Sequence, residues 1–109
     1  MIPRGAQIYI ALEPIDMRYS FDRLAGLARE RVGYDVEGGA LFIFFGRRRE
    51  TVKVLFCDGT GICVFYKRLH RGCFPLLTVA AGAAHVEIGE DMLDALLDGL
   101  EVAVKLDMH

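Results

Sequence analysis

Three short apolar segments in the middle of the chain constrain the fold more than any other sequence feature. They span residues 40–45, 51–57 and 61–66, and all three are rich in β-branched or aromatic residues. Only a few turn-forming or charged residues separate each segment from the next, which is the spacing of β-hairpins. The sequence therefore predicts three consecutive antiparallel strands joined by two hairpins.

The second hairpin carries the dipeptide Asp58-Gly59, which favours a two-residue type I′ turn because both central residues of that turn need a positive φ. In the register that such a turn sets, Lys53 lies opposite Val64 and Thr51 lies opposite Tyr66. Lys53 then shares one sheet face with apolar side chains of both strands.

Basic residues gather at one end of these hairpins, three in the first loop and three after the last strand. They are Arg47, Arg48, Arg49, Lys67, Arg68 and Arg71. Consecutive arginines in a turn cannot all be buried in a core, so their charge faces water or an anion. Because the loop precedes one strand and the second group follows that strand's hairpin partner, we expect the two groups to be neighbours in space.

The net charge of −2 conceals an uneven distribution along the chain. Residues 40–74 hold seven basic residues against Glu50 and Asp58, giving +5, whereas residues 75–109 hold seven acids against Lys105, giving −6. Two interpretations are open. The basic segment binds a polyanion such as nucleic acid, or the two sets of charges pair with each other across the fold.

The remaining elements complete a single domain over residues 1–109. Strands are predicted at 7–12, at 85–88 and in the tail from 101, and helices at 20–32 and 90–100. Ser20 stands at the N-cap position of the first helix and Gly33 just after its end. We expect one compact α+β domain whose antiparallel sheet has about four to six strands and is accompanied by two helices.

Residue types typical of catalytic or metal sites are sparse. The one serine, Ser20, is explained as a helix cap, which leaves no Ser-His-acid triad. The spacing of Cys57, Cys63, His70 and Cys73 matches no standard zinc site. The sequence predicts no catalytic residue, no metal ligand and no cofactor. A small nuclease using the C-terminal acids is the weaker alternative.

Targeting and membrane signals are likewise missing from the sequence. The longest apolar stretches reach about half of the roughly 18 residues that a membrane span needs. The N-terminus reads Met-Ile-Pro-Arg-Gly, without a hydrophobic signal core. We expect a cytoplasmic protein with reduced cysteines and no membrane partner.

Five motifs in the first two thirds of the chain resemble a known family. They are Asp16-Met17-Arg18-Tyr19-Ser20-Phe21-Asp22-Arg23-Leu24, Leu41-Phe42-Ile43-Phe44 with Arg47-Arg48, Lys53-Val54-Leu55, Asp58-Gly59-Thr60-Gly61, and Lys67-Arg68-Leu69 with Gly72 and Phe74. In this order they are similar to the TnpB accessory proteins of the insertion sequence 66 transposon family. The resemblance implies a non-catalytic protein, encoded beside a separate DDE transposase and needed for efficient transposition.

The resemblance and the basic groups together predict an accessory protein for DNA transposition that binds DNA phosphates. The expected DNA contacts are Arg18, Arg47, Arg48, Arg49, Lys53, Lys67, Arg68 and Arg71. Arg18 is included for its place in the family-like Asp-Met-Arg motif, although a structural pair with Asp16 or Asp22 also explains it. The alternative function is a protein-interaction adaptor, which docks on the transposase through the acidic helix 90–100 or an exposed strand without touching DNA. Both functions are compatible with a homo-oligomer.

Overall fold

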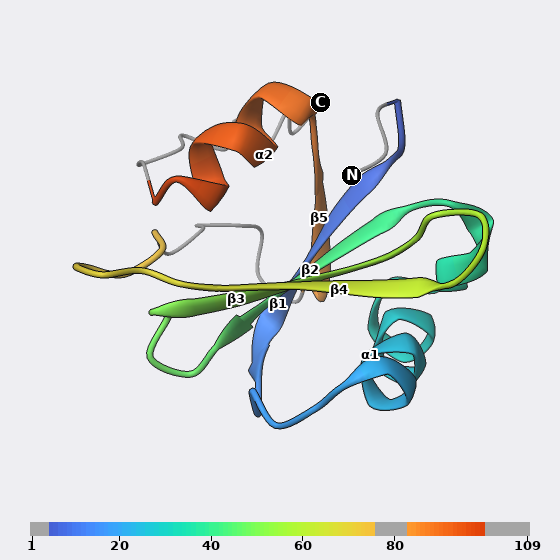
Figure 1. The fold of residues 1–109 in the computed structure, drawn as a ribbon, viewed down its shortest axis with the longest axis horizontal. Helices are drawn as coiled ribbons and strands as arrows, with labels where there is room; N and C mark the ends of the chain where they lie inside the picture. The colour runs from blue at the N-terminus through green and yellow to red at the C-terminus, as the bar shows by residue number, and fades with distance from the viewer. Residues whose placement is uncertain (1–4, 76–82, 100–109) are drawn as a thin grey trace.

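Five strands form one mixed sheet in the computed structural model, which describes residues 5–75 and 83–99 (Figure 1). The strands are β1 (Ile8–Ile15), β2 (Leu41–Gly46), β3 (Thr51–Cys57), β4 (Ile62–Arg68) and β5 (His85–Ile88). Their order across the sheet is β4-β3-β2-β1-β5. The three predicted central segments and the strands predicted at 7–12 and 85–88 are thus confirmed. The tail strand predicted from residue 101 lies outside the described residues.

Helices follow β1 and β5. The first helical segment is α1 (Phe21–Leu27), which continues as a π-helical turn, η1 (Ala28–Val32), and the second is α2 (Glu90–Leu97). Gly33 ends the first segment with a φ of 94°, a left-handed conformation that glycine adopts without strain. Ser20 occupies the N-cap position, but its side chain makes no capping hydrogen bond. The predicted helix 20–32 is confirmed.

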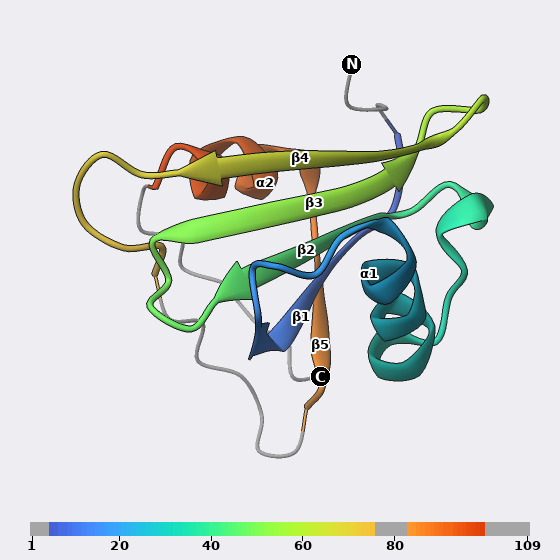
Figure 2. The same cartoon turned by 60° about the horizontal axis from the view of Figure 1, so that its bottom comes forward.

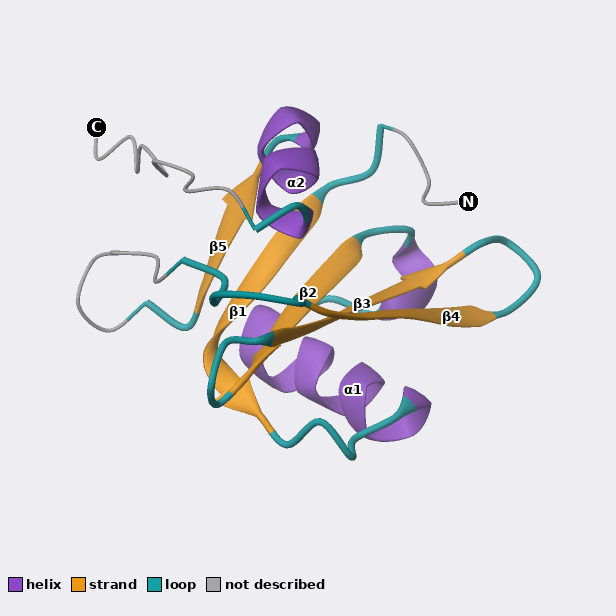
Figure 3. Ribbon diagram, turned by 60° about the vertical axis from the view of Figure 1, so that its left-hand side comes forward, coloured by secondary structure: helices purple, strands orange, loops and turns teal. Residues whose placement is uncertain are grey.

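The two helices cover opposite faces of the sheet (Figure 3). On one face, α1 and η1 pack on Tyr9, Phe42 and Phe44. On the other face, α2 packs over a core that includes Ile10 and Ile43. Strand β2 is buried along its whole length because both of its faces are covered, which explains its continuous apolar sequence.

The fold class is α+β, as predicted, and three of the four strand pairings are antiparallel. The pairing of β1 with β2 is parallel. The antiparallel expectation was wrong for this pair because the helical segment 21–32 carries the chain back along the sheet before β2 begins.

The β3–β4 hairpin differs from the predicted register by two residues. Lys53 lies opposite Tyr66, and Thr51 lies opposite Arg68. The loop is four residues long, Asp58 to Gly61, because the Asp58 carboxylate accepts backbone N–H bonds from Thr60 and Gly61 at 2.9 and 3.0 Å. A shift of two residues keeps every side chain on its predicted face.

No helix among residues 5–75 and 83–99 is long and apolar enough to cross a lipid bilayer.

Candidate nucleic-acid interface

The two basic groups lie together at one end of the sheet, as predicted. Thr51, the first residue after the arginine loop, pairs with Arg68 at the end of β4. The chain then folds back on the loop: the N–H of Leu69 donates to the carbonyl oxygen of Glu50 at 2.9 Å, and that of Phe74 donates to Arg49 at 2.6 Å. Figure 2 shows the β2–β3 loop and the end of β4 side by side at this end.

A cavity of about 330 Å³, here called the basic groove, opens between the β1–α1 loop and the β2–β3 loop. It is lined by Ile15, Asp16, Met17, Gly46, Arg47, Arg48, Glu50, Thr51 and Arg68. Arg47, Arg48 and Arg68 are exposed to solvent. Three arginines from two segments therefore line the basic groove.

Gly46 lets the two walls of the basic groove approach each other. A Cβ atom at this position would collide with the Oγ1 of Thr51 and would lie 3.2 Å from the Cγ of Met17. The glycine is thus required by the close approach of the neighbouring side chains, since contacts this short force a shift of the surrounding atoms.

Arg18 forms an ion pair with Asp16 beside the basic groove. Its Nη2 lies 2.6 Å from the Oδ2 of Asp16, and its backbone N–H donates to Oδ1 at 2.9 Å. These hydrogen bonds, aided by the charge of Arg47, lower the pKa of Asp16 to about 2. The pairing considered for Arg18 is present, but its side chain stays almost fully exposed.

Lys53 is a correction to the predicted DNA contacts, because its side chain is buried, with 7% of the residue's surface exposed. The ammonium donates to the carbonyl oxygens of Met17 at 2.7 Å and Tyr19 at 2.6 Å, and it lies 4.8 Å from the ring centroid of Tyr66. Burial lowers its pKa. Lys53 therefore holds the β1–α1 loop on the sheet and does not present its charge to solvent.

Arg49 is a second correction, because its guanidinium is occupied within the protein. It donates to the carbonyl oxygens of Phe74, at 3.2 Å, and Pro75, and it lies 4.6 Å from the ring centroid of Phe45. Partial burial lowers its pKa. Its φ of 60° is the one positive value for a non-glycine residue in the described parts of the chain. Arg49 anchors the segment after β4.

Lys67 connects the basic segment to the acidic one. Its ammonium donates to the carbonyl oxygen of Leu97 at 2.6 Å and lies 3.9 Å from a carboxylate oxygen of Asp98. A cation at this place also compensates the negative end of the α2 dipole. For Lys67, then, the interpretation in which the two charge sets pair across the fold is correct.

Unlike Arg49 and Lys53, which donate to carbonyl oxygens, and Arg18 and Lys67, which are ion-paired, four of the predicted contacts have neither an ion pair nor a side-chain hydrogen bond within the described residues: Arg47, Arg48, Arg68 and Arg71. All four are exposed. Together with Arg18 they form the charged surface that remains available to an anion.

The aromatic residues near these arginines belong mostly to the core. Phe42, Phe44 and Phe45 are buried, whereas Tyr66 is 55% exposed and lies beside Arg68 in a shallow hollow. Tyr66 is not among the contacts predicted from the sequence. Its position near the end of β4, on the same face as Arg68, is the signal that distinguishes it from the phenylalanines.

Residues that bind metals do not cluster in the described ranges: no group of three or more His, Cys, Asp or Glu side chains there is arranged to hold an ion. Cys57, Cys63 and Cys73 are free thiols.

Comparisons with known proteins point to one family. A family model described as "IS66 Orf2 like protein" matches residues 6–106. "Uncharacterized protein y4hO" of Sinorhizobium fredii is 37% identical over 103 residues, which cover 93% of this chain and 88% of that protein. "Uncharacterized protein y4jC" of the same organism is 31% identical over 103 residues, covering 94% and 88%. No solved structure matches the chain.

Proposed function

The chain belongs to the IS66 Orf2-like family of insertion-sequence accessory proteins, and from that membership we propose that it assists transposition by binding DNA, without catalysing strand cleavage or joining. The DNA lies across the end of the sheet that carries the basic groove. The contacts are made by Arg18, Arg47, Arg48, Arg68 and Arg71, with Tyr66 at the margin.

The arrangement of Arg47, Arg48 and Arg68 around one hollow is the observation that supports this proposal most strongly. None of the three is paired with a carboxylate in the described part of the chain. Planar guanidinium groups form bidentate hydrogen bonds with phosphate oxygens, and arginine is therefore favoured where a protein grips a nucleic-acid backbone.

Contacts of this kind recognise the DNA backbone and carry no sequence information. Each neutralised phosphate releases condensed counterions, so the logarithm of the affinity falls with the logarithm of salt by about 0.9 per contact. Three arginines in the basic groove therefore contribute about 3 to the slope.

The experiment that tests the proposal is fluorescence-anisotropy titration with labelled duplexes across a series of salt concentrations. One duplex comes from an end of the element and one is its scrambled counterpart. The protein is compared with the triple variant Arg47→Gln, Arg48→Gln, Arg68→Gln, in which the slope should fall by about 3.

A matched control removes the same charge from the first helical segment through Arg23→Gln, Arg29→Gln and Arg31→Gln. None of these residues lines the basic groove, and Arg29 and Arg31 are already paired with Asp35 and Glu13. An equal loss of slope in both variants assigns binding to net charge alone. No binding of the unaltered protein at low salt rejects the DNA role.

The adaptor function is the second candidate, and the exposed carboxylates of α2 favour it. Glu90, Asp91 and Asp94 all face solvent. If the unaltered protein does not bind DNA and the triple variant still co-purifies with the transposase of the element, the protein acts as an adaptor.

A further inference from the structure

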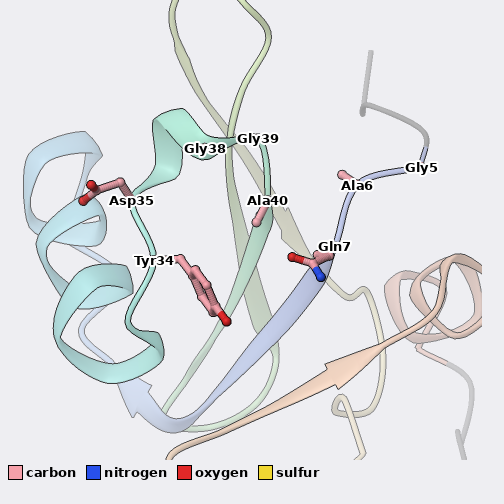
Figure 4. A pocket seen from close by; sticks show the side chains of 8 residues that line it. All are labelled: Gly5, Ala6, Gln7, Tyr34, Asp35, Gly38, Gly39 and Ala40. Carbon is pink, nitrogen blue, oxygen red and sulfur yellow. The ribbon is translucent and has the colours of Figure 1, made fainter.

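A second cavity, here called the tyrosine cavity, opens at the opposite end of the sheet, where β1 and β2 begin (Figure 4). It measures about 570 Å³ and is lined by Gly5, Ala6, Gln7, Tyr34, Asp35, Gly38, Gly39 and Ala40. This volume lies within the range of sites that hold small molecules or single side chains of a partner. The proposed DNA contacts do not reach it.

Tyr34 provides a fixed aromatic surface in this cavity. Its ring stacks on that of Tyr9, with centroids 5.0 Å apart and planes 15° from parallel, and Tyr9 in turn stacks on Phe42 at 6.0 Å. Tyr34 nevertheless remains 49% exposed. Figure 4 shows its ring reaching from the loop after η1 toward Gln7. One ring face is thus held by the core, while the tyrosine retains surface for a ligand.

The opposite walls offer backbone and amide groups. A Cβ atom built on Gly5, Gly38 or Gly39 would have no other atom within 4 Å, so open space adjoins each of them. The Oε1 of Gln7 accepts a hydrogen bond from the hydroxyl of Tyr9 at 3.1 Å, which orients the amide and leaves its two N–H donors. A ligand can therefore lie flat on Tyr34 and offer a carbonyl oxygen to Gln7.

The rim of the tyrosine cavity is acidic. Asp35 lines it, and the carboxylate of Glu90 accepts the N–H of Gly5, which also lines it. Glu37, in the 3-10 turn η2 (Val36–Gly38), lines a separate hollow beside Gly59. Glu87 pairs with Tyr9 in the sheet register and contributes to the rise of its pKa. Among the described residues, Arg29 is the one cation paired with this rim, 2.6 Å from Asp35.

We propose that the tyrosine cavity binds an arginine side chain presented by a protein partner. The flat guanidinium stacks on Tyr34 and is attracted by the surrounding carboxylates, and Gln7 donates to the backbone of the partner segment. A nucleotide stacks on the same ring, but its phosphate is repelled by the acidic rim. This assignment does not depend on the proposed DNA role, since it concerns the other end of the molecule.

The test is an NMR titration of the isotope-labelled protein with the peptide Gly-Ser-Gly-Arg-Gly-Ser-Gly. Saturable shifts are expected at the backbone amides of Gln7, Gly38 and Gly39. The same peptide with citrulline, an uncharged and nearly isosteric side chain, should bind at least about fivefold more weakly, because the charge supplies the attraction to the ring and the carboxylates.

Variants locate the binding in the cavity. Tyr34→Ala should weaken binding about two- to fivefold, whereas Tyr34→Phe keeps the ring and the affinity. Phe21→Ala is the matched control, because Phe21 is an exposed aromatic of similar accessibility, 46%, on the first turn of α1. Gly38→Leu adds a bulky side chain at the cavity wall, where nothing lies within 4 Å of the Cβ position, and should weaken binding even if Tyr34→Ala does not fold.

Three outcomes overturn the proposal. They are the absence of saturable shifts with the arginine peptide, equal affinity for the citrulline peptide, and tighter binding of adenosine monophosphate than of the arginine peptide. The last outcome would show that the cavity binds a nucleobase and not an arginine side chain.

Discussion

The ammonium of Lys53 lies 2.7 Å from the carbonyl oxygen of Met17, so a residue in the interior of the sheet holds the loop on which Arg18 stands. Lys53 belongs to β3 and Met17 to the segment between β1 and α1. The exposed arginine of the family-like motif is therefore positioned by a buried cation, and the two residues have different tasks although both were predicted to touch DNA.

Replacement of Lys53 tests its role in holding the β1–α1 loop on the sheet. We expect Lys53→Met to lower the free energy of unfolding by about 1–3 kcal/mol, because it leaves the carbonyls of Met17 and Tyr19 without their donor. Urea denaturation measures the change. Arg48→Gln serves as the exposed control, with an expected effect within about 0.5 kcal/mol. A Lys53→Met protein as stable as the parent contradicts the assigned role.

The titration of Asp16 reports the ion pair with Arg18. Its pKa is about 2 in the folded protein against an ordinary value of 3.8. Because the folded-state pKa is the lower one, the pair contributes stability above the ordinary value and loses it as the pH falls through about 2. NMR observation of the side-chain carboxyl carbon measures this pKa. In Arg18→Gln it should return toward 3.8, and an unchanged value would assign the shift to other groups.

Substitution of Gly46 tests the close approach that shapes the basic groove. Gly46→Ala should lower the free energy of unfolding by about 1–3 kcal/mol, because the added methyl group collides with Thr51. Gly38→Ala is the control, since nothing lies within 4 Å of the Cβ position there. Thermal denaturation, monitored by circular dichroism, compares the two variants. Similar melting temperatures would show that Thr51 and Met17 move to accommodate the added methyl group.

Two substitutions of Arg49 separate its backbone strain from its hydrogen bonds. Both Arg49→Gly and Arg49→Ala lose the bonds to Phe74 and Pro75, so both should be less stable than the parent. Glycine accepts the φ of 60° without steric cost, whereas alanine does not. Arg49→Gly should therefore be the more stable of the two by about 1 kcal/mol in urea denaturation. The reverse order would place the β2–β3 loop in another conformation.

The pKa of Tyr9 determines how the stability of the protein changes at high pH. Burial, the neighbouring Tyr34 and the charge of Glu87 raise its pKa to about 12 from an ordinary value of 10.0. Since the folded-state pKa is the higher one, this contribution to stability is complete below pH 10.0 and is lost as the pH rises through about 12. Ultraviolet titration of tyrosinate measures the shift, and Tyr9→Phe should remove the late-titrating group. If all tyrosines titrate near 10 in the folded protein, Tyr9 is not buried as described.

The positions of the strands were predictable because each carries a local pattern of β-branched and aromatic residues. The register of β3 with β4 was not, because the Asp58 side chain competes for the backbone donors of its own turn and lengthens the loop. The parallel pairing of β1 with β2 depends on how the intervening helix packs, which a local pattern does not encode.

The basic groove was partly predictable, since hairpin geometry brings the arginine loop and the end of β4 together. The separate roles of its cations were not. Lys53, Arg49 and Lys67 all donate to backbone carbonyls of distant segments, at Met17, Phe74 and Leu97. Every residue type provides such a carbonyl, so the sequence carries no sign of these partners. Only for Lys53 did the sequence indicate burial, because its predicted position is on an apolar face of the sheet.

The place of β1 between β2 and β5 has a consequence for synthesis of the protein. Ile8 and Ile10 pair with Ile88 and Val86, from the other end of the described chain. While the ribosome is still making the intervening segment, the outer edge of β1 stays open, with its amide and carbonyl groups unpaired. A translation product that stops after β4 therefore ends its sheet on the eight-residue strand β1, whereas the finished sheet ends there on the four-residue β5, and the longer free edge favours aggregation.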